Sequence, residues 1–313
     1  MVLNTGGRRR TGMLNRIRRS LKGYQLFLML LPALLYIIIF KYWPIYGIQL
    51  AFKKYMPGLE IARAPWVGFK HFRDFFHSYQ FSRVLSNTLA LSLYELLVSF
   101  PVPILLALML NQVGNAKRKA LMENVFYVPH FISVVVLVGM INVFFSLSNG
   151  LVNNLAAALG GERVNYIGKA SAFRHLYVFS GVWKNAGWNA IIYIAALSGI
   201  DPGLYEAATI DGANRWQRIL HIEMPGILPV ISMMFIMGMG NIMSIGFEKA
   251  YLMQNSLNSS TSEIIATYVY KVGLLQVKYD YSTAVGLFNN VINVVLLVIA
   301  NTISRRLTES SLW

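Results

Sequence analysis

The chain contains six runs of apolar residues, each about as long as the 20 or so residues that a helix needs to cross a bilayer. They are Tyr24–Phe40, Thr88–Leu110, Val125–Phe145, Leu176–Ile200, Ile227–Phe247 and Ala284–Ile303. The sequence is 56% hydrophobic and only 13% charged, which is too apolar for an ordinary soluble domain of 313 residues. The runs therefore predict an all-α integral membrane protein with about six transmembrane helices.

Composition excludes several other classes of protein. The chain has no cysteine, which rules out disulfides, thiol catalysis and cysteine-rich metal sites. Its five histidines show no HxxxH spacing of the kind that holds a metal ion. The formal net charge of +15 would suit a nucleic-acid partner, but no basic stripe is interleaved with aromatic residues. Cations at membrane–water boundaries explain the charge, so we expect neither a metal site nor a nucleic-acid partner.

Basic residues set the expected orientation. A cluster precedes the first apolar run: Arg8, Arg9, Arg10, Arg16, Arg18, Arg19 and Lys22. Because cytoplasmic segments are enriched in Lys and Arg, we expect the N-terminus inside, and six crossings return the C-terminus to the same side. The outer loops also carry cations, so this prediction depends on the N-terminal cluster. It gives a basic cytoplasmic tail at 1–23, a membrane domain at 24–306 and a cytoplasmic tail at 307–313.

A polar stretch, residues 201–224, lies between the fourth and fifth apolar runs. Asp201 is a good N-cap and Pro202 suits the first helical position, so a helix is expected to begin there. Gly212 can adopt the left-handed backbone that ends this helix. A second short helix is expected from Ala213 to Ile222, before Pro225 stops it. The stretch therefore predicts a helix–Gly–helix elbow that projects from the membrane.

One face of this elbow has a low profile that suits insertion into a cleft on another protein. The residues of this candidate docking site are Glu206, Ala207, Ala208, Asp211 and Gly212. The two alanines keep the face free of bulky side chains. We therefore expect a protein partner on the side of the membrane that the elbow faces.

Polar groups inside the fourth apolar run indicate a pathway through the membrane. Lys184 is costly at that depth and should face water, a carboxylate or a ligand. Asn185, Trp188 and Asn189 can share one helical face, because they stand at i, i+3 and i+4. Sugars stack their C–H faces on aromatic rings, while amides and charges bind the hydroxyl groups. These four residues are therefore candidates for a sugar path.

A structural role for the same residues is the alternative. Lys184 would then pair with Glu95 or Glu248. The indole rings of the run would anchor the helix at the membrane interface, where Trp is enriched.

The fifth apolar run is rich in methionine and glycine. Gly238 and Gly240 are expected to pack structurally, because small residues let helices approach closely. Asn241 and Ser244 are candidate pore-lining groups. The chain has no GxxxxGK[ST] loop, so it is not expected to hydrolyse ATP by that chemistry, and no catalytic residue is predicted.

Aromatic and basic residues mix in the outer segment 52–81. Phe69, Phe72 and Phe76 recur at helical spacing, which predicts an amphipathic segment along the outer interface. Such a segment would either dock a protein from outside or anchor the chain in the lipid headgroups.

These features together resemble the permeases of carbohydrate-uptake ABC importers, and in particular the branch that includes permeases for alginate and other complex oligosaccharides. The elbow resembles their "EAA" loop, which docks on the cytoplasmic ATPase. The resemblance covers nearly the whole chain from about residue 24. The phrases that carry it are Val67-Gly68-Phe69, Asn87-Thr88, Val128-Pro129-His130-Phe131-Ile132-Ser133, Trp183-Lys184-Asn185-Ala186-Gly187-Trp188, Ile200-Asp201-Pro202 with the following Glu-Ala-Ala, Thr267-Tyr268-Val269-Tyr270, and Ser282-Thr283-Ala284-Val285-Gly286-Leu287-Phe288.

The resemblance implies a working complex in the bacterial inner membrane. Its expected partners are a second, related permease, a dimer of cytoplasmic ABC ATPases, an extracytoplasmic sugar-binding protein, an oligosaccharide substrate and membrane lipid. ATP and Mg would be bound by the ATPase, and this chain would bind no cofactor. ATP binding and hydrolysis would switch the cavity between outward and inward access.

The resemblance also implies which helices hold the sugar, namely those before and after the elbow. Lys184, Asn185 and Trp188 match such positions before it, and Gly238, Ile242 and Ile245 match such positions after it. Ile242 and Ile245 are apolar where polar groups are expected after it, so Asn241 and Ser244 would serve instead.

Two other classes of function are compatible with an apolar chain of this kind. In an ion-coupled secondary sugar transporter, Lys184, Glu95 and Glu248 would form an ion relay. That class needs an internal inverted repeat, and the two halves of the chain show no obvious matching broken helices. A non-transporting membrane scaffold is the other alternative.

Overall fold

The computed structural model describes residues 24–308, and their backbone is helical apart from loops and one isolated bridge between Lys53 and Trp66. The tails predicted at 1–23 and 309–313 lie outside the described residues. Four described helices are long and apolar enough to cross a membrane, and a bent pair makes a fifth candidate. The all-α membrane class predicted from the sequence is confirmed.

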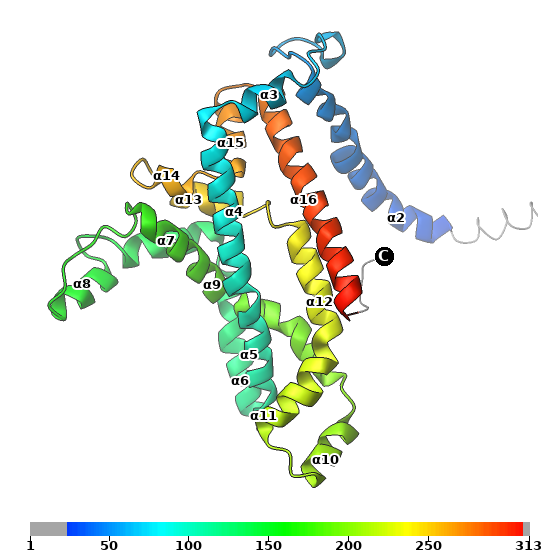
Figure 1. The fold of residues 1–313 in the computed structure, drawn as a ribbon, viewed down its shortest axis with the longest axis vertical. Coiled ribbons are helices and arrows are strands. Elements are labelled where there is room, and N and C mark those ends of the chain that lie inside the picture. Colours follow the sequence, from blue (N-terminus) through cyan, green and yellow to red (C-terminus); the bar gives the residue numbers. More distant parts are fainter. Residues whose placement is uncertain (1–23, 309–313) are drawn as a thin grey trace, which may run out of the picture.

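The first apolar run forms a helix that stands apart from the rest of the molecule (Figure 1). It comprises α2 (Tyr24–Ile37), the π-helical turn η1 (Ile38–Tyr42) and the 3₁₀ segment η2 (Trp43–Phe52). The side chains resolved along α2 are exposed, and only η2 packs against α16 (Tyr279–Thr308). Such an apolar surface is expected to face lipid or another membrane protein.

The second run is one long helix made of α4 (Tyr79–Ser99) and α5 (Pro101–Asn111). Pro101 and Pro103 do not end it, because they stand in the first turn of α5, where the missing N–H costs least. A short helix, α3 (Lys70–Phe76), precedes it at the end of the molecule away from the elbow (Figure 1).

The third run is not the straight helix that the sequence predicted. It consists of α6 (Ala116–Tyr127), η4 (Val128–Phe131) and α7 (Val134–Phe144), and the pair is bent by 96°. Ile132 has extended backbone, and the Ser133 hydroxyl then caps α7 by accepting a hydrogen bond from the Val136 N–H. Hydrophobicity continues through the bend, so the apolar pattern does not reveal it.

The fourth run is α9 (Ala170–Ser198), which at 29 residues is long enough to span a bilayer. It is not among the apolar candidates, because Lys184 and the nearby amides lower its hydropathy. The fifth run was predicted to continue to Phe247, but α12 (Met224–Gly240) ends at Gly240. A non-helical segment, 241–246, follows before α13 (Phe247–Met253).

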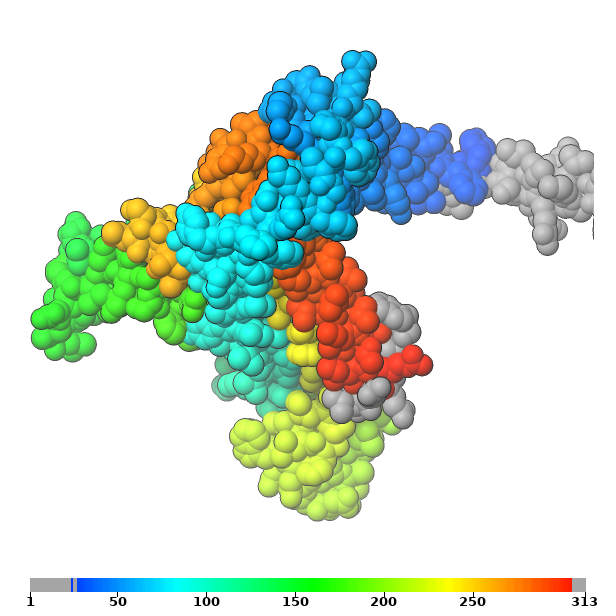
Figure 2. All heavy atoms as spheres, turned by 45° about the horizontal axis from the view of Figure 1, so that its top comes forward, coloured from blue at the N-terminus to red at the C-terminus, as the bar shows by residue number. Residues whose placement is uncertain are grey.

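The remaining helices are short and belong either to the loops or to the elbow. Those of the loops are η3 (Ile61–Arg63), α8 (Leu151–Ala158), α14 (Ser259–Ser262), α15 (Ile265–Tyr270) and η6 (Lys271–Leu275). Those of the elbow are α10 (Pro202–Ile210), α11 (Arg215–Arg218) and η5 (Ile219–Glu223). The elbow helices form a separate lobe at one end in both whole-molecule views (Figures 1 and 2).

The core has three clusters, which lie where α4, α7, α9 and α13 meet, where α5, α9 and α12 meet, and where α3, α4 and α16 meet. In the third cluster Phe75 is fully buried in a group of aromatic rings that includes Phe81, Tyr268 and Phe288. Phe69 is the N-cap of α3 and is exposed, so an interfacial role for it stays a prediction, and the buried anchor of α3 is Phe75, which the helical spacing did not single out.

Candidate functional site: the elbow and the polar cavity

The first half of the elbow has the predicted local geometry. The Asp201 carboxylate caps α10 by accepting a hydrogen bond from the Gly203 N–H at 2.9 Å. On the helix that follows, Glu206 and Ala207 are exposed and Ala208 is half-buried. Their exposure leaves the low-profile face open to a partner.

Gly212 ends α10 in the left-handed conformation that the sequence predicted, with φ of +76°. The Ala213 N–H donates to the Ala208 carbonyl at 2.8 Å, and the Gly212 N–H donates to the Thr209 carbonyl at 3.1 Å. These are the paired bonds of a Schellman motif. No atom lies within 4 Å of a Cβ built on Gly212, so glycine is required here by backbone conformation and not by lack of space.

The second half of the elbow differs from the prediction. Asn214 and Gln217 form a capping box that starts α11, with hydrogen bonds of 2.9 Å and 2.7 Å. The helix then runs without a break from Arg215 to Gly240, so Pro225 does not stop it. The π-helical turn η5 immediately before α12 already interrupts the regular α-type hydrogen bonds, and Pro225 falls in the first turn of α12, where proline is tolerated.

Apolar side chains are exposed at the tip of the elbow. Ile210 is 87% exposed and Trp216 is 73% exposed. Neither residue belongs to one of the apolar runs that would face lipid. A hollow of about 330 Å³ between the two elbow helices is lined by Asp211, Gly212 and Arg218, among others. An exposed Trp and Ile on a projecting lobe are typical of a surface that another protein covers.

Two of the predicted fourth-run residues contact the bend in the third run. Asn185 Oδ1 lies 3.1 Å from His130 Nδ1. The His130 ring stacks on Trp188 with centroids 4.3 Å apart and planes within 3°, and Phe131 meets the same indole edge-on. One face of Trp188 is therefore covered by protein, and the half-exposed remainder is what a sugar could reach.

The carboxylate of Glu95 interacts with a different lysine from the one that the sequence suggested. Its electrostatic partner is Lys249, which also donates to the Tyr177 carbonyl at 2.5 Å and lies over the Tyr177 ring. A Cβ on Gly181 would lie 3.1 Å from Lys249 Nζ and 3.7 Å from Glu95 Oε1, so α9 passes directly beside this pair. Among residues 24–308, Lys184 forms no salt bridge with Glu95 or Glu248, which does not support the structural alternative.

A polar cavity of about 320 Å³ opens where the fifth run breaks. Both predicted fifth-run residues, Asn241 and Ser244, line it, together with Glu95 of α4. Gly238, Ile242 and Ile245, the positions after the elbow to which the resemblance points, line it as well. The cavity thus brings together groups from two helices that are far apart in sequence.

Two asparagines of α16 hold the broken backbone beside this cavity, and the sequence analysis missed them. Asn293 accepts a hydrogen bond from the Met243 N–H at 2.9 Å and donates to the Ser244 hydroxyl at 2.8 Å. Asn289 donates to the Met243 carbonyl at 3.2 Å. Non-helical backbone at membrane depth needs such partners. Their i, i+4 spacing, which places both amides on one face of a helix within the sixth apolar run, is the signal that would have found them.

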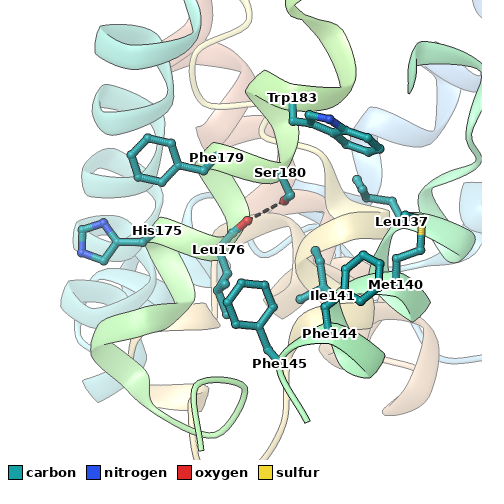
Figure 3. A pocket seen from close by; sticks show the side chains of 10 residues that line it. All are labelled: Leu137, Met140, Ile141, Phe144, Phe145, His175, Leu176, Phe179, Ser180 and Trp183. Atoms are coloured by element: carbon teal, nitrogen blue, oxygen red, sulfur yellow. Dashed lines mark hydrogen bonds between the residues drawn. The ribbon is translucent and has the colours of Figure 1, made fainter. Parts of the chain in front are cut away.

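The predicted fourth-run residues do not line the polar cavity. Trp183 lies on another side of α9, in an apolar groove of about 390 Å³ between α7 and α9 (Figure 3). The Trp183 indole and the rings of Phe144, Phe145 and Phe179 surround this groove. Lys184 lines neither region, and its charge acts on Lys249.

Comparison with known proteins gives a consistent result. The family model for the binding-protein-dependent transport system inner membrane component matches residues 10–309. The chain is 43% identical to Protein LplB of Bacillus subtilis (strain 168) over 92% of this chain and 91% of that one. It is 42% identical to the polygalacturonan/rhamnogalacturonan transport system permease protein YteP of the same organism, over 92% and 90%.

Solved structures give the same assignment. The chain is 41% identical to one chain in the crystal structure of a bacterial ABC transporter involved in the import of the acidic polysaccharide alginate, with a TM-score of 0.86. The match covers 94% of this chain and 99% of that one. A bacterial alginate ABC transporter in complex with an alginate pentasaccharide-bound periplasmic protein gives a TM-score of 0.87 at 40% identity. The chain belongs to the family of binding-protein-dependent transport system inner membrane components, and it is a permease of the ABC-importer type.

Proposed function

We propose that this chain is the permease subunit of an ATP-driven importer for acidic oligosaccharides, and that its elbow is the surface on which the cytoplasmic ATPase docks. The observation that carries the ATPase interface is the projecting lobe with exposed Ile210 and Trp216 beside a rigidly capped Gly212 turn. A lever must be stiff to transmit force, and the Schellman motif and capping box make this turn stiff.

The acidic nature of the substrate is supported in two ways. The relative YteP and the alginate transporter are named for uronate-containing polymers. In this chain, the buried Lys249 lies beside Glu95, which lines the polar cavity together with Asn241 and Ser244, and Lys184 is close enough for its charge to act on Lys249. Cations in a partly desolvated path attract carboxylates and lower the cost of moving them through the membrane.

The cycle that we propose is alternating access. A binding protein delivers the oligosaccharide from outside, a second related permease completes the path, and a dimer of ATPases supplies the energy with its own ATP and Mg. Closure of the ATPases moves the elbow, and the elbow moves the spans that line the cavity. The termini lie on the cytoplasmic side, as does the elbow.

The absence of cysteine allows a direct test of the two docking surfaces. A single Ile210→Cys variant carrying a photo-crosslinker should capture the ATPase subunit in the assembled complex. A matched Ser260→Cys variant in the exposed loop at the other end should capture the sugar-binding protein, more efficiently with sugar and ATP present. Capture of the binding protein from Ile210→Cys would show that the orientation is inverted. Failure to capture the ATPase from the elbow, in a complex that still hydrolyses ATP, would contradict the proposed interface.

A further inference from the structure

Glu223 is a carboxylate buried where the elbow joins the membrane domain. It is the last residue of η5 and is only 1% exposed. The sequence analysis did not single it out, and it is not one of the low-profile residues of the elbow. A buried carboxylate is costly unless its oxygens are bound, so the groups around it need an explanation.

The partners of Glu223 come from the cytoplasmic end of α5. Asn111 Nδ2 donates to Glu223 Oε1 at 2.9 Å, and Gln112 Nε2 donates to the same oxygen at 2.7 Å. Asn111 is the last residue of α5 and Gln112 is its C-cap. A negative charge is disfavoured at a helix C-terminus by the helix dipole. The two side-chain amides therefore hold the carboxylate at a place that would otherwise repel it.

The elbow helices meet Glu223 from the other side. The hydroxyl of Tyr205, on α10, lies beside Glu223 and Asn111, and burial followed by the charge of Glu223 raises the pKa of Tyr205. A tyrosine hydroxyl is protonated at neutral pH in any case, and the raised pKa moves its ionisation still further from that range, so it can donate to a carboxylate. Three polar atoms at this junction are buried and form no hydrogen bond with any other group of residues 24–308. They are Glu223 Oε2, the Tyr205 hydroxyl and Arg218 Nε.

The α4–α5 helix, whose last residues bind Glu223, also reaches the polar cavity. α5 is continuous with α4, as one helix from Tyr79 to Asn111. Glu95 stands 16 residues before Asn111 along this helix, which corresponds to about 24 Å at 1.5 Å per residue. The same helix therefore carries Asn111 at the elbow and Glu95 at the cavity.

We infer that Glu223 is a positioning residue that fastens the elbow to the α4–α5 helix, so that displacement of the elbow is delivered to the wall of the polar cavity. This inference rests on the proposed function, which gives the elbow an ATPase to move it. If Glu223 only packs, its removal should destabilise the folded chain and do nothing more. If it couples the elbow to the cavity, its removal should also let the complex hydrolyse ATP without importing sugar.

The test compares three variants in the complete complex reconstituted in proteoliposomes. Glu223→Ala removes the acceptor of both amides, and Glu223→Gln keeps one oxygen for them. Ser198→Ala is the matched control near the same end, because the Ser198 hydroxyl donates only to Ile194 within its own helix. The measurements are the amount of ATPase bound, the rate of ATP hydrolysis and the amount of oligosaccharide imported per ATP hydrolysed.

We expect Glu223→Ala to bind the ATPase normally and to hydrolyse ATP, but to import roughly tenfold less sugar per ATP, a typical size for lost coupling between two sites. Glu223→Gln should recover most of that ratio, and Ser198→Ala should match the unmodified chain. An unchanged ratio in Glu223→Ala, or a fall in assembly that accounts for the whole loss of uptake, would overturn the inference. Absence of ATPase binding in the unmodified complex would instead contradict the proposed function.

Discussion

At the scale of single residues, backbone conformation and charge decide what the site can do. Gly212 was predicted from the sequence because a left-handed turn is a local property of the chain. Lys249 was not predicted as the partner of Glu95, because only the tertiary fold brings these two side chains together. Local features of this kind are visible in a sequence, whereas pairings across helices are not.

Replacing Gly212 by Val should uncouple the complex. A β-branched side chain opposes the left-handed turn by about 1 kcal/mol or more and would rotate the second elbow helix. We expect normal insertion in the membrane with reduced sugar-stimulated ATPase activity and reduced uptake. Gly58→Val is the matched control, because Gly58 also has positive φ with open space around it but lies in the loop at the opposite end. Equal effects of the two substitutions would mean that only folding was disturbed.

Replacing Lys184 by Met should select between substrates. If this cation binds acidic groups of the sugar, uptake of a uronate oligosaccharide should fall roughly tenfold, as expected for a charged hydrogen bond of about 1.5 kcal/mol. Uptake of a neutral oligosaccharide of the same length should change little, and Lys184→Arg should retain uronate transport. An equal loss for both sugars would assign Lys184 a structural role.

At the scale of elements, the breaks within the apolar runs are what the sequence did not reveal. The bend at Ile132–Ser133 and the break after Gly240 both lie inside continuous hydrophobic stretches. The bonds that satisfy the second break come from Asn289 and Asn293 on another helix. The apolar runs themselves, and the elbow between two of them, were predictable because they depend on length and local capping.

The packing of α9 against α6 depends on a close approach at Gly187. A Cβ there would overlap the Phe126 carbonyl, so Gly187→Ala should push the two helices apart and destabilise the complex by about 1–3 kcal/mol. We expect a lower melting temperature in detergent. Gly139→Ala, on α7 with no atom within 4 Å of the added Cβ, should not lower it. An unchanged melting temperature for Gly187→Ala would show that the two helices are not packed so closely.

At the scale of the whole molecule, the fold places an exposed elbow at one end (Figure 1) and a polar cavity where the fifth run breaks. The long α4–α5 helix extends between them. The exposed apolar surface of α2 and the groove near Trp183 are further faces that a membrane partner or lipid must cover. This arrangement suits a subunit that transmits movement.

The most direct test of the central claim is uptake of a uronate oligosaccharide into proteoliposomes that contain this chain, its partner permease and the ATPase, with the loaded binding protein outside. ATP enclosed with the ATPase should drive accumulation, and a proton or sodium gradient without ATP should not. Accumulation driven by an ion gradient alone, unaffected by removal of ATP, would contradict the account and favour a secondary transporter.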